Sequence, residues 1–165
     1  MVLLNWKMPL LEQNNRRRCV KMFARLLHEM KFDQIFNQYT IQEIITLSSA
    51  PEISDESILP YACMDYLSAK VTNRDDLFLL HHHMAFIMSF HLNYLPDAYE
   101  IAFRHFCFAA SLKPNDLMIR REILLIYQFL PDYTMNVEEG ERIAKEMLDI
   151  DPNCVEALHY LEQIC

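Results

Sequence analysis

Two stretches of thirteen residues decide the fold: AFRHFCFAASLKP, residues 102–114, and GERIAKEMLDIDP, residues 140–152. Each begins with a small residue, places apolar residues four and seven positions later, and ends on a proline five positions after that. Small residues let a neighbouring helix approach, larger ones fill the groove, and proline ends the helix. The pattern therefore predicts packed α-helices. Its positions are Ala102, Phe106, Ala109 and Pro114 in the first stretch, and Gly140, Ala144, Met147 and Pro152 in the second.

A second helix follows each proline, because apolar residues again recur every three or four positions. They are Ile119, Ile123, Leu124 and Tyr127 after the first stretch, and Ala157, Leu158, Leu161 and Ile164 after the second. With Ala102-x-x-x-Phe106 in one helix and Leu158-x-x-Leu161 in the next, residues 83–165 resemble the tetratricopeptide repeat, a stacked helix pair. The resemblance implies antiparallel pairs stacked as a short α-solenoid, with residues 154–165 as its capping helix.

The match to this family is degenerate. The distance from Pro114 to Pro152 is 38 residues where the family has 34, and the extra residues fall in the turn 130–136. The aromatic residue that opens the first helix of a pair is Phe86 in one pair, but Arg120 and Leu158 stand at that place in the next two. Residues 1–72 show no clear repeat.

Helix boundaries are predicted from caps and prolines. Five Asn, Asp or Thr residues precede an acidic residue by three positions, a pattern that satisfies two backbone amides at a helix start. The cap pairs are Thr40 with Glu43, Asn73 with Asp76, Asp97 with Glu100, Asn136 with Glu139, and Asn153 with Glu156. The chain is expected to be one all-α domain of seven to nine helices, with no strand. The predicted helices are 10–30, with a continuation or a break towards 38, then 41–48, 55–71, 75–95, 97–112, 117–130, 137–149 and 154–165.

Composition excludes several classes of protein. The chain has 165 residues, 52% of them hydrophobic, and a single glycine, Gly140. Phosphate-binding loops, dinucleotide-binding fingerprints and tight hairpin turns need glycine, so most nucleotide-binding α/β enzymes and most all-β domains are excluded. The five cysteines form no C-x-x-C pair, which argues against a disulfide framework or a zinc knuckle.

The sequence favours a cytoplasmic protein, because no signal peptide is recognised at its start. Residues 77–95 carry no Lys, Arg, Asp or Glu and are long enough to span a bilayer. They also hold four histidines, which makes a buried helix the better interpretation.

Charge is distributed unevenly along the chain. The net charge is −8; residues 1–31 contribute +5, residues 32–131 contribute −6 and residues 132–165 contribute −7. Acids and bases four apart in helix 137–149, such as Glu138 with Arg142, Glu141 with Lys145, and Lys145 with Asp149, are typical of a solvated helix face. The same acids can instead form a partner-binding surface that attracts a basic protein and repels nucleic acid.

The sequence offers little reactive chemistry. At most two of His81, His82 and His83 can face one ion, because consecutive helical residues point about 100° apart. A helical metalloenzyme that uses these histidines, His91 and Asp75 or Asp76 remains the least favoured alternative. The run Arg16–Arg18 has no interleaved aromatic residues, so a solvated face is favoured over phosphate binding. We expect no cofactor, no bound metal, no nucleic acid and no membrane.

We therefore expect a non-catalytic protein-binding module, most concretely an acidic immunity or antitoxin type inhibitor of a basic partner such as a nuclease toxin. The alternative is a repeat adaptor or peptide-sensing regulator. The family resemblance implies a binding surface formed by Met84, Ile87, His91, Tyr94 and Leu95, and by Met118, Arg121, Leu125, Gln128 and Phe129. The acidic surface would add Glu138, Glu139, Glu146, Asp149 and Glu156, together with His159.

Overall fold

The structure is a computed structural model that describes residues 10–50, 53, 57–129 and 136–164, with side chains given for 15–50, 53, 57–125 and 136–164. The regular elements in these residues are nine α-helices with no strand, which confirms the predicted all-α class and helix count. The chain divides into two compact units, an N-terminal unit of Met1–Val71 and a C-terminal unit of Thr72–Cys165. The expectation of a single domain stays a prediction.

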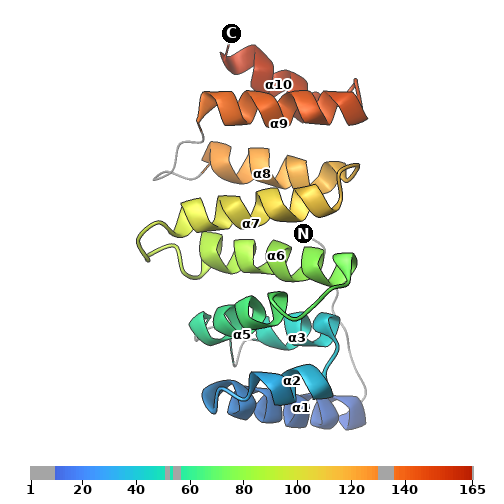
Figure 1. The fold of residues 1–165 in the computed structure, drawn as a ribbon, viewed down its shortest axis with the longest axis vertical. Coiled ribbons are helices and arrows are strands. Elements are labelled where there is room, and N and C mark those ends of the chain that lie inside the picture. The colour runs from blue at the N-terminus through green and yellow to red at the C-terminus, as the bar shows by residue number, and fades with distance from the viewer. Residues whose placement is uncertain (1–9, 51–52, 54–56, 130–135, 165) are drawn as a thin grey trace. The chain divides into compact units, whose positions relative to one another are not determined.

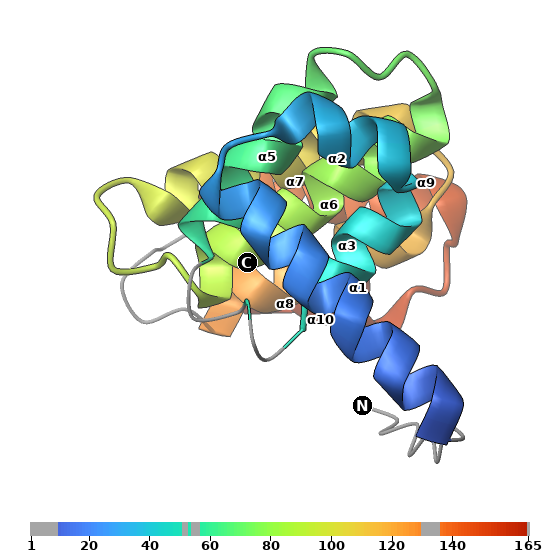
Figure 2. The same cartoon turned by 90° about the horizontal axis from the view of Figure 1, so that it is seen from below.

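The N-terminal unit is built from short helices packed on one longer helix. α1 (Leu10–His28) contacts α2 (Phe32–Gln38), α5 (Ile58–Ser68) packs on both, and α3 (Ile41–Ser48) follows α2 along the chain (Figures 1 and 2). Met30 separates α1 from α2, because its φ of 52° is left-handed and the amide of Lys31 returns to the carbonyl of Leu26. This hydrogen bond closes a helix end in the way a glycine usually does.

The C-terminal unit is a succession of longer helices. α6 (Arg74–Phe90), α7 (Ala98–Leu112), α8 (Leu117–Phe129), α9 (Val137–Ile150) and α10 (Val155–Ile164) each pack on the next, and α8 also contacts α10 (Figure 1). One apolar cluster runs through all five helices. Its buried members are Ala85, Phe103, Phe106, Ala109, Ala110, Ile119, Ile123, Leu124, Ile143, Ala144, Met147, Cys154, Ala157 and Tyr160.

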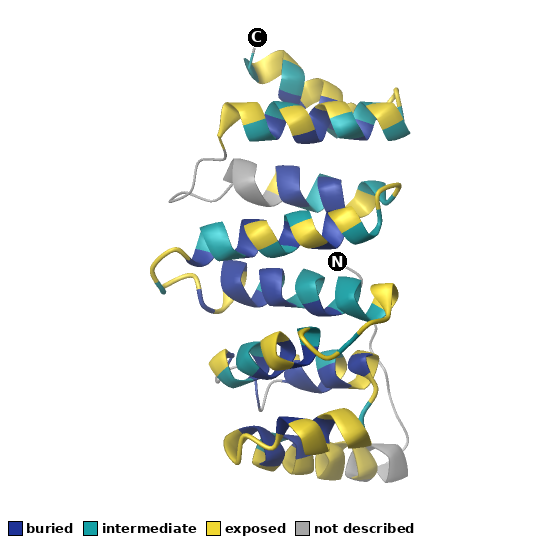
Figure 3. Cartoon of the chain, in the orientation of Figure 1, coloured by how far each residue is buried: buried dark blue, intermediate teal, exposed yellow. Residues whose placement is uncertain are grey.

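The two stretches that decide the fold form α7 and α9, and their spaced residues face inward. Ala102, Phe106 and Ala109 are fully buried, as are Ala144 and Met147, and Figure 3 shows buried and exposed residues on opposite sides of these helices. Gly140 is also buried. A Cβ atom there would overlap the phenol ring of Tyr160, so the missing side chain is what lets α10 approach α9 this closely.

Three of the predicted helix caps are present in the structure, and Asp97 does not form the predicted one. Thr40 and Glu43 form a complete capping box at α3, and Asn73 and Asn136 accept backbone N–H groups at the starts of α6 and α9. Asp97 makes no side-chain cap and instead adopts a left-handed φ of 58°. α10 begins at Val155, one residue later than predicted, and in the turn before it the carboxylate of Asp151 accepts the amide of Asn153. That the side chain of Asn153 caps this helix stays a prediction.

α6 ends earlier than predicted. The amides of His91 and Leu92 both donate to the carbonyl of Ile87, which closes the helix at Phe90 and not at residue 95. Tyr94 and Leu95 therefore lie in the turn that leads to α7.

Candidate functional site

Two side-chain pairs, a hydrogen-bonded histidine and carboxylate and an ion pair of arginine and carboxylate, join α6, α8 and α10, which are not consecutive in the chain. His82 Nε2 on α6 lies 2.5 Å from a carboxylate oxygen of Glu122 on α8. Arg121 Nε, also on α8, lies 2.8 Å from a carboxylate oxygen of Glu156 on α10. We call the surface that these three helices share the α6–α8–α10 face. α8 forms its centre, because its two side-chain pairs reach in opposite directions.

The exposed stripe of α8 lies between these two side-chain pairs. Met118 and Leu125 are seven positions apart, on the same side of the helix, and are 57% and 41% exposed. Ile119, Ile123 and Leu124 lie on the opposite side and are buried. α8 therefore exposes two apolar side chains to solvent, with the charged Arg121 and Glu122 on either side of them. The side chains of Gln128 and Phe129 lie outside the described residues.

An aromatic ladder follows α6 beside this stripe. Phe78, His82, Phe86 and Phe90 are spaced by four, and their neighbouring ring centroids lie 5.2 to 5.6 Å apart. Phe106 on α7 packs against this ladder, with its ring centroid 5.8 Å from that of Phe86. The ladder ends at Phe90, which is 51% exposed. It places a rigid apolar edge next to the stripe of α8.

The residues of α6 that were expected on the binding surface take other positions. Met84 is fully buried and Ile87 is 5% exposed, so neither is available to a partner. His91 and Tyr94 are exposed, but they lie beyond the end of the helix. Along α6, Phe86 is partly exposed and Phe90 is exposed, and each lies one residue before a predicted position, Ile87 or His91. The sequence carried a signal for them, because both belong to the four-residue aromatic spacing that begins at Phe78.

α10 borders the face with polar groups. Glu156 is half-buried, and hydrogen bonding to its own backbone amide, then to the Cys154 thiol and Arg121, lowers its pKa. His159 is exposed, and its Nε2 atom lies 2.9 Å from the side-chain amide nitrogen Nε2 of Gln163. These are the two residues of α10 that the sequence placed in the binding surface.

The acidic residues of α9 are only partly free. Glu141 pairs with Lys145 as predicted, whereas Arg142 pairs with Glu146 at 2.6 Å and not with Glu138. Glu138 and Asp149 are exposed and Glu139 is half-buried, and no described basic side chain pairs with them. The outer side of α9 thus alternates in charge. A compact acidic patch on α9 alone is not what the structure shows.

The negative charge belongs to the C-terminal unit as a whole. Residues 1–71 hold eight Lys and Arg and eight Asp and Glu, whereas residues 72–165 hold seven and fifteen, so the entire net charge of −8 falls in residues 72–165. Six of those seven basic side chains form ion pairs with described carboxylates, and Arg74 donates to the carbonyl of Leu112. An approaching protein therefore meets unpaired carboxylates rather than free cations.

The histidine run is divided among different neighbours. His81 Nδ1 lies 2.8 Å from His105 Nδ1 on α7, His82 pairs with Glu122, and burial lowers the pKa of His83 to about 4. Within the described residues, no group of three or more His, Cys, Asp or Glu side chains is placed to hold a metal ion. The sequence pattern missed His105, because its partner is 24 positions away.

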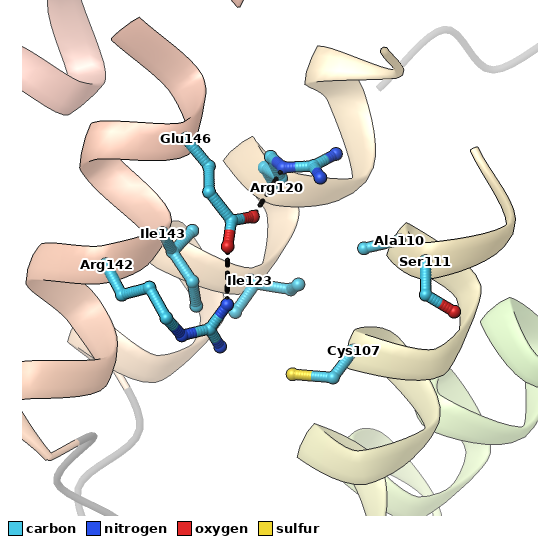
Figure 4. Close-up of a pocket in the computed structure, with 8 residues that line it drawn as sticks. All are labelled: Cys107, Ala110, Ser111, Arg120, Ile123, Arg142, Ile143 and Glu146. Carbon is cyan, nitrogen blue, oxygen red and sulfur yellow. Dashed lines mark hydrogen bonds and ion pairs between the residues drawn. The ribbon is translucent and has the colours of Figure 1, made fainter. Parts of the chain in front are cut away.

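A cavity of about 230 Å³ lies between α7, α8 and α9 (Figure 4). Its polar wall consists of Cys107, Ser111, Arg120, Arg142 and Glu146. Glu146 accepts Arg120 Nε at 3.0 Å and Arg142 Nη1 at 2.6 Å, and so joins the two guanidinium groups. Burial raises the pKa of the Cys107 thiol, and the neighbouring Arg142 opposes this only in part. The reactive thiolate is therefore a smaller fraction of this thiol than of an unperturbed cysteine, and the thiol reacts more slowly.

Comparisons with protein-family models, with curated proteins and with solved structures gave no match for this chain. Among the helices in the described ranges, none is both long enough and apolar enough to cross a bilayer.

Proposed function

We propose that this chain is a non-catalytic protein-binding module, most concretely an acidic inhibitor of the immunity or antitoxin type that occludes a basic partner such as a nuclease toxin. The observation that carries the proposal is the charge balance of residues 72–165. Their basic side chains are held in internal pairs while Glu138, Asp149 and other carboxylates stay unpaired. Such a surface speeds encounter with a basic protein and selects against acidic ones.

The α6–α8–α10 face supplies the contact that follows encounter. Phe90, Met118 and Leu125 expose apolar surface there, and the flanking pairs His82–Glu122 and Arg121–Glu156 hold the three helices in place. Long-range charge sets the association rate, whereas buried apolar anchors set the lifetime of a complex. The stacked helices with small buried residues also support the proposed likeness to tetratricopeptide repeats.

The same apolar side chains favour a second candidate, a repeat adaptor or regulator that binds a short peptide. The two candidates differ in the ligand that suffices. A peptide adaptor gains thermal stability from an isolated segment of its partner, whereas the inhibitor requires the folded basic protein.

The test is capture from a lysate of the producing cells on the immobilised full chain, followed by titration with the purified partner. We expect a basic protein whose nuclease activity falls to zero at a one-to-one ratio, with binding at least tenfold weaker at about 500 mM salt than at about 50 mM. A neutral or acidic partner, or binding that salt leaves unchanged, would contradict the proposal.

Two double variants test the effect of charge on the association rate separately from the effect of apolar contact on the dissociation rate. Glu138→Lys combined with Asp149→Lys should slow association with little effect on dissociation. Leu125→Ala combined with Met118→Ala should instead speed dissociation. Phe108→Ala is the matched control, because Phe108 is 45% exposed but lies on α7, outside this face. Equal effects of the control and the α8 variant would exclude the α6–α8–α10 face as the contact.

A further inference from the structure

Arg120 is a charged residue in an apolar position. Its side chain is 9% exposed, and Ile119, Ile123 and Leu124 beside it on α8 are buried. Burying a guanidinium costs free energy that an ion pair only partly recovers, and an apolar residue of similar size is often as stable. Stability alone therefore does not explain an arginine here, and the cavity that it lines offers another reason.

That cavity carries the opposite charge to the unit around it. Two guanidinium groups, Arg120 and Arg142, face a single carboxylate, Glu146, which leaves the wall with a net charge of +1 inside a unit of net −8. Arg120 gives one N–H to Glu146 and one to the carbonyl of Asp116. A guanidinium has five N–H donors, so it retains donors for a second acceptor.

We propose that this cavity binds a small organic monocarboxylate, a function separate from the protein-binding role above. The carboxylate would accept from Arg142 and Arg120, neutralising the excess positive charge, and its hydrocarbon chain would lie against Ala110, Ile123 and Ile143. A cavity of about 230 Å³ has room for about eight water-sized groups, which matches a carboxylate with four or five carbons. Phosphate, with its second charge and no apolar part, fits less well.

The rate at which the Cys107 thiol is alkylated measures whether a ligand occupies the cavity. In Figure 4 its Sγ points into the space that Arg142 and Glu146 border, so a bound ligand would cover it. Cys19 is exposed on α1 and serves as the internal reference. N-ethylmaleimide labelling, read per cysteine by peptide mass spectrometry, therefore measures occupancy at this site and not the general stability of the fold.

The probe is pentanoate, with pentanamide as its uncharged equivalent and inorganic phosphate at equal ionic strength as the salt control. On the full chain we expect about 10 mM pentanoate to slow labelling of Cys107 at least threefold, to leave Cys19 unchanged, and to raise the unfolding midpoint by about 3 °C. Pentanamide and phosphate should do neither. Equal protection by either of them, or none by pentanoate, would overturn the proposal.

Arg142→Gln supplies the matched test of the charge. Arg142 is half exposed and its removal should leave the fold intact while weakening pentanoate protection at least tenfold. Arg104→Gln is the control, because Arg104 is exposed on α7 and pairs with Glu100 at the same i,i+4 spacing but lies outside the cavity. If both variants, or neither, lost protection, the site would not be the one assigned here.

Discussion

The arginines of α1 and two arginines of α8 are used in different ways. On α1, Arg17, Arg18 and Lys21 are exposed, and no described acidic side chain pairs with them. In the C-terminal unit, arginines tie neighbouring helices together, as Arg120 ties α8 to α9 and Arg121 ties α8 to α10. Arginine is therefore a solvated group on α1 and part of the packing at Arg120 and Arg121. Composition alone does not distinguish these two uses.

The largest expected effect tests whether the two compact units unfold separately. Phe106→Ala removes a fully buried ring that contacts Phe86 and His82, and should destabilise the C-terminal unit by about 3–5 kcal/mol. Hydrogen exchange measured by mass spectrometry should show lost protection in α6 to α9 and unchanged protection in α1. Phe108→Ala, on the same helix and 45% exposed, should have a much smaller effect. Equal loss of protection in α1 would show that the chain unfolds as one unit.

The second prediction compares the contribution to stability of one arginine from each unit. Arg120→Gln breaks the pair with Glu146 in a nearly buried position and should lower the free energy of unfolding by about 2 kcal/mol. Arg18→Gln changes an exposed side chain and should alter it by less than about 0.5 kcal/mol. Urea denaturation followed by circular dichroism measures both. Similar losses of unfolding free energy in the two variants would show that the buried and the exposed arginine contribute equally to stability.

His83 gives the C-terminal unit a dependence on pH. Burial, with the neighbouring His82 and His91, lowers its pKa to about 4, so the folded chain keeps this histidine neutral where the unfolded chain has bound a proton. Stability should therefore fall as the pH drops from about 6.5 to about 4, by up to about 3 kcal/mol for this residue.

His83→Gln should flatten this part of the stability profile, measured by urea denaturation at pH 7 and pH 4.5. His159→Gln should leave it unchanged, because His159 is exposed. A profile of unaltered slope in the first variant would mean that other groups carry the pH dependence.

The smallest expected effect concerns the short helices of the N-terminal unit, which depend on their ends. Thr40→Ala removes the hydroxyl that accepts the amide of Glu43, and should cost about 1 kcal/mol. Gln42→Ala, in the same first turn and exposed, is the control. Thermal unfolding compares the two, and no difference between them would show that the capping box contributes nothing measurable.

Local signals predicted most helix starts to within one residue. For α2 they predict either a continuation of the first helix or a break after it, and α5 begins at Ile58 where residue 55 is predicted. Ile41–Ser48 was predicted residue for residue, because Thr40 and Glu43 act within one turn. The end of α6 was missed, because it is set by backbone hydrogen bonds to Ile87 and the nearest proline comes only at residue 96.

The candidate site was predictable only on one of its helices. On α8 the buried side, formed by Ile119, Ile123 and Leu124, follows from the sequence pattern. Met118 is exposed, while Arg121 is half-buried. α6 is apolar around most of its circumference, so its periodicity does not select which stripe is buried, and the predicted register was one residue off. The pair His81–His105 and the clamp of two arginines on Glu146 depend on contacts between helices, which one sequence does not reveal.

Gly140 has a consequence for how this sequence can change over generations. The chain uses its one glycine to admit the ring of Tyr160, so these two positions are constrained jointly although twenty residues separate them. A lineage that first replaces the ring with a smaller side chain is then free to gain a methyl group at position 140. In the opposite order, a methyl group at position 140 requires the ring of Tyr160 to leave its place against α9 first, so the two changes are not interchangeable.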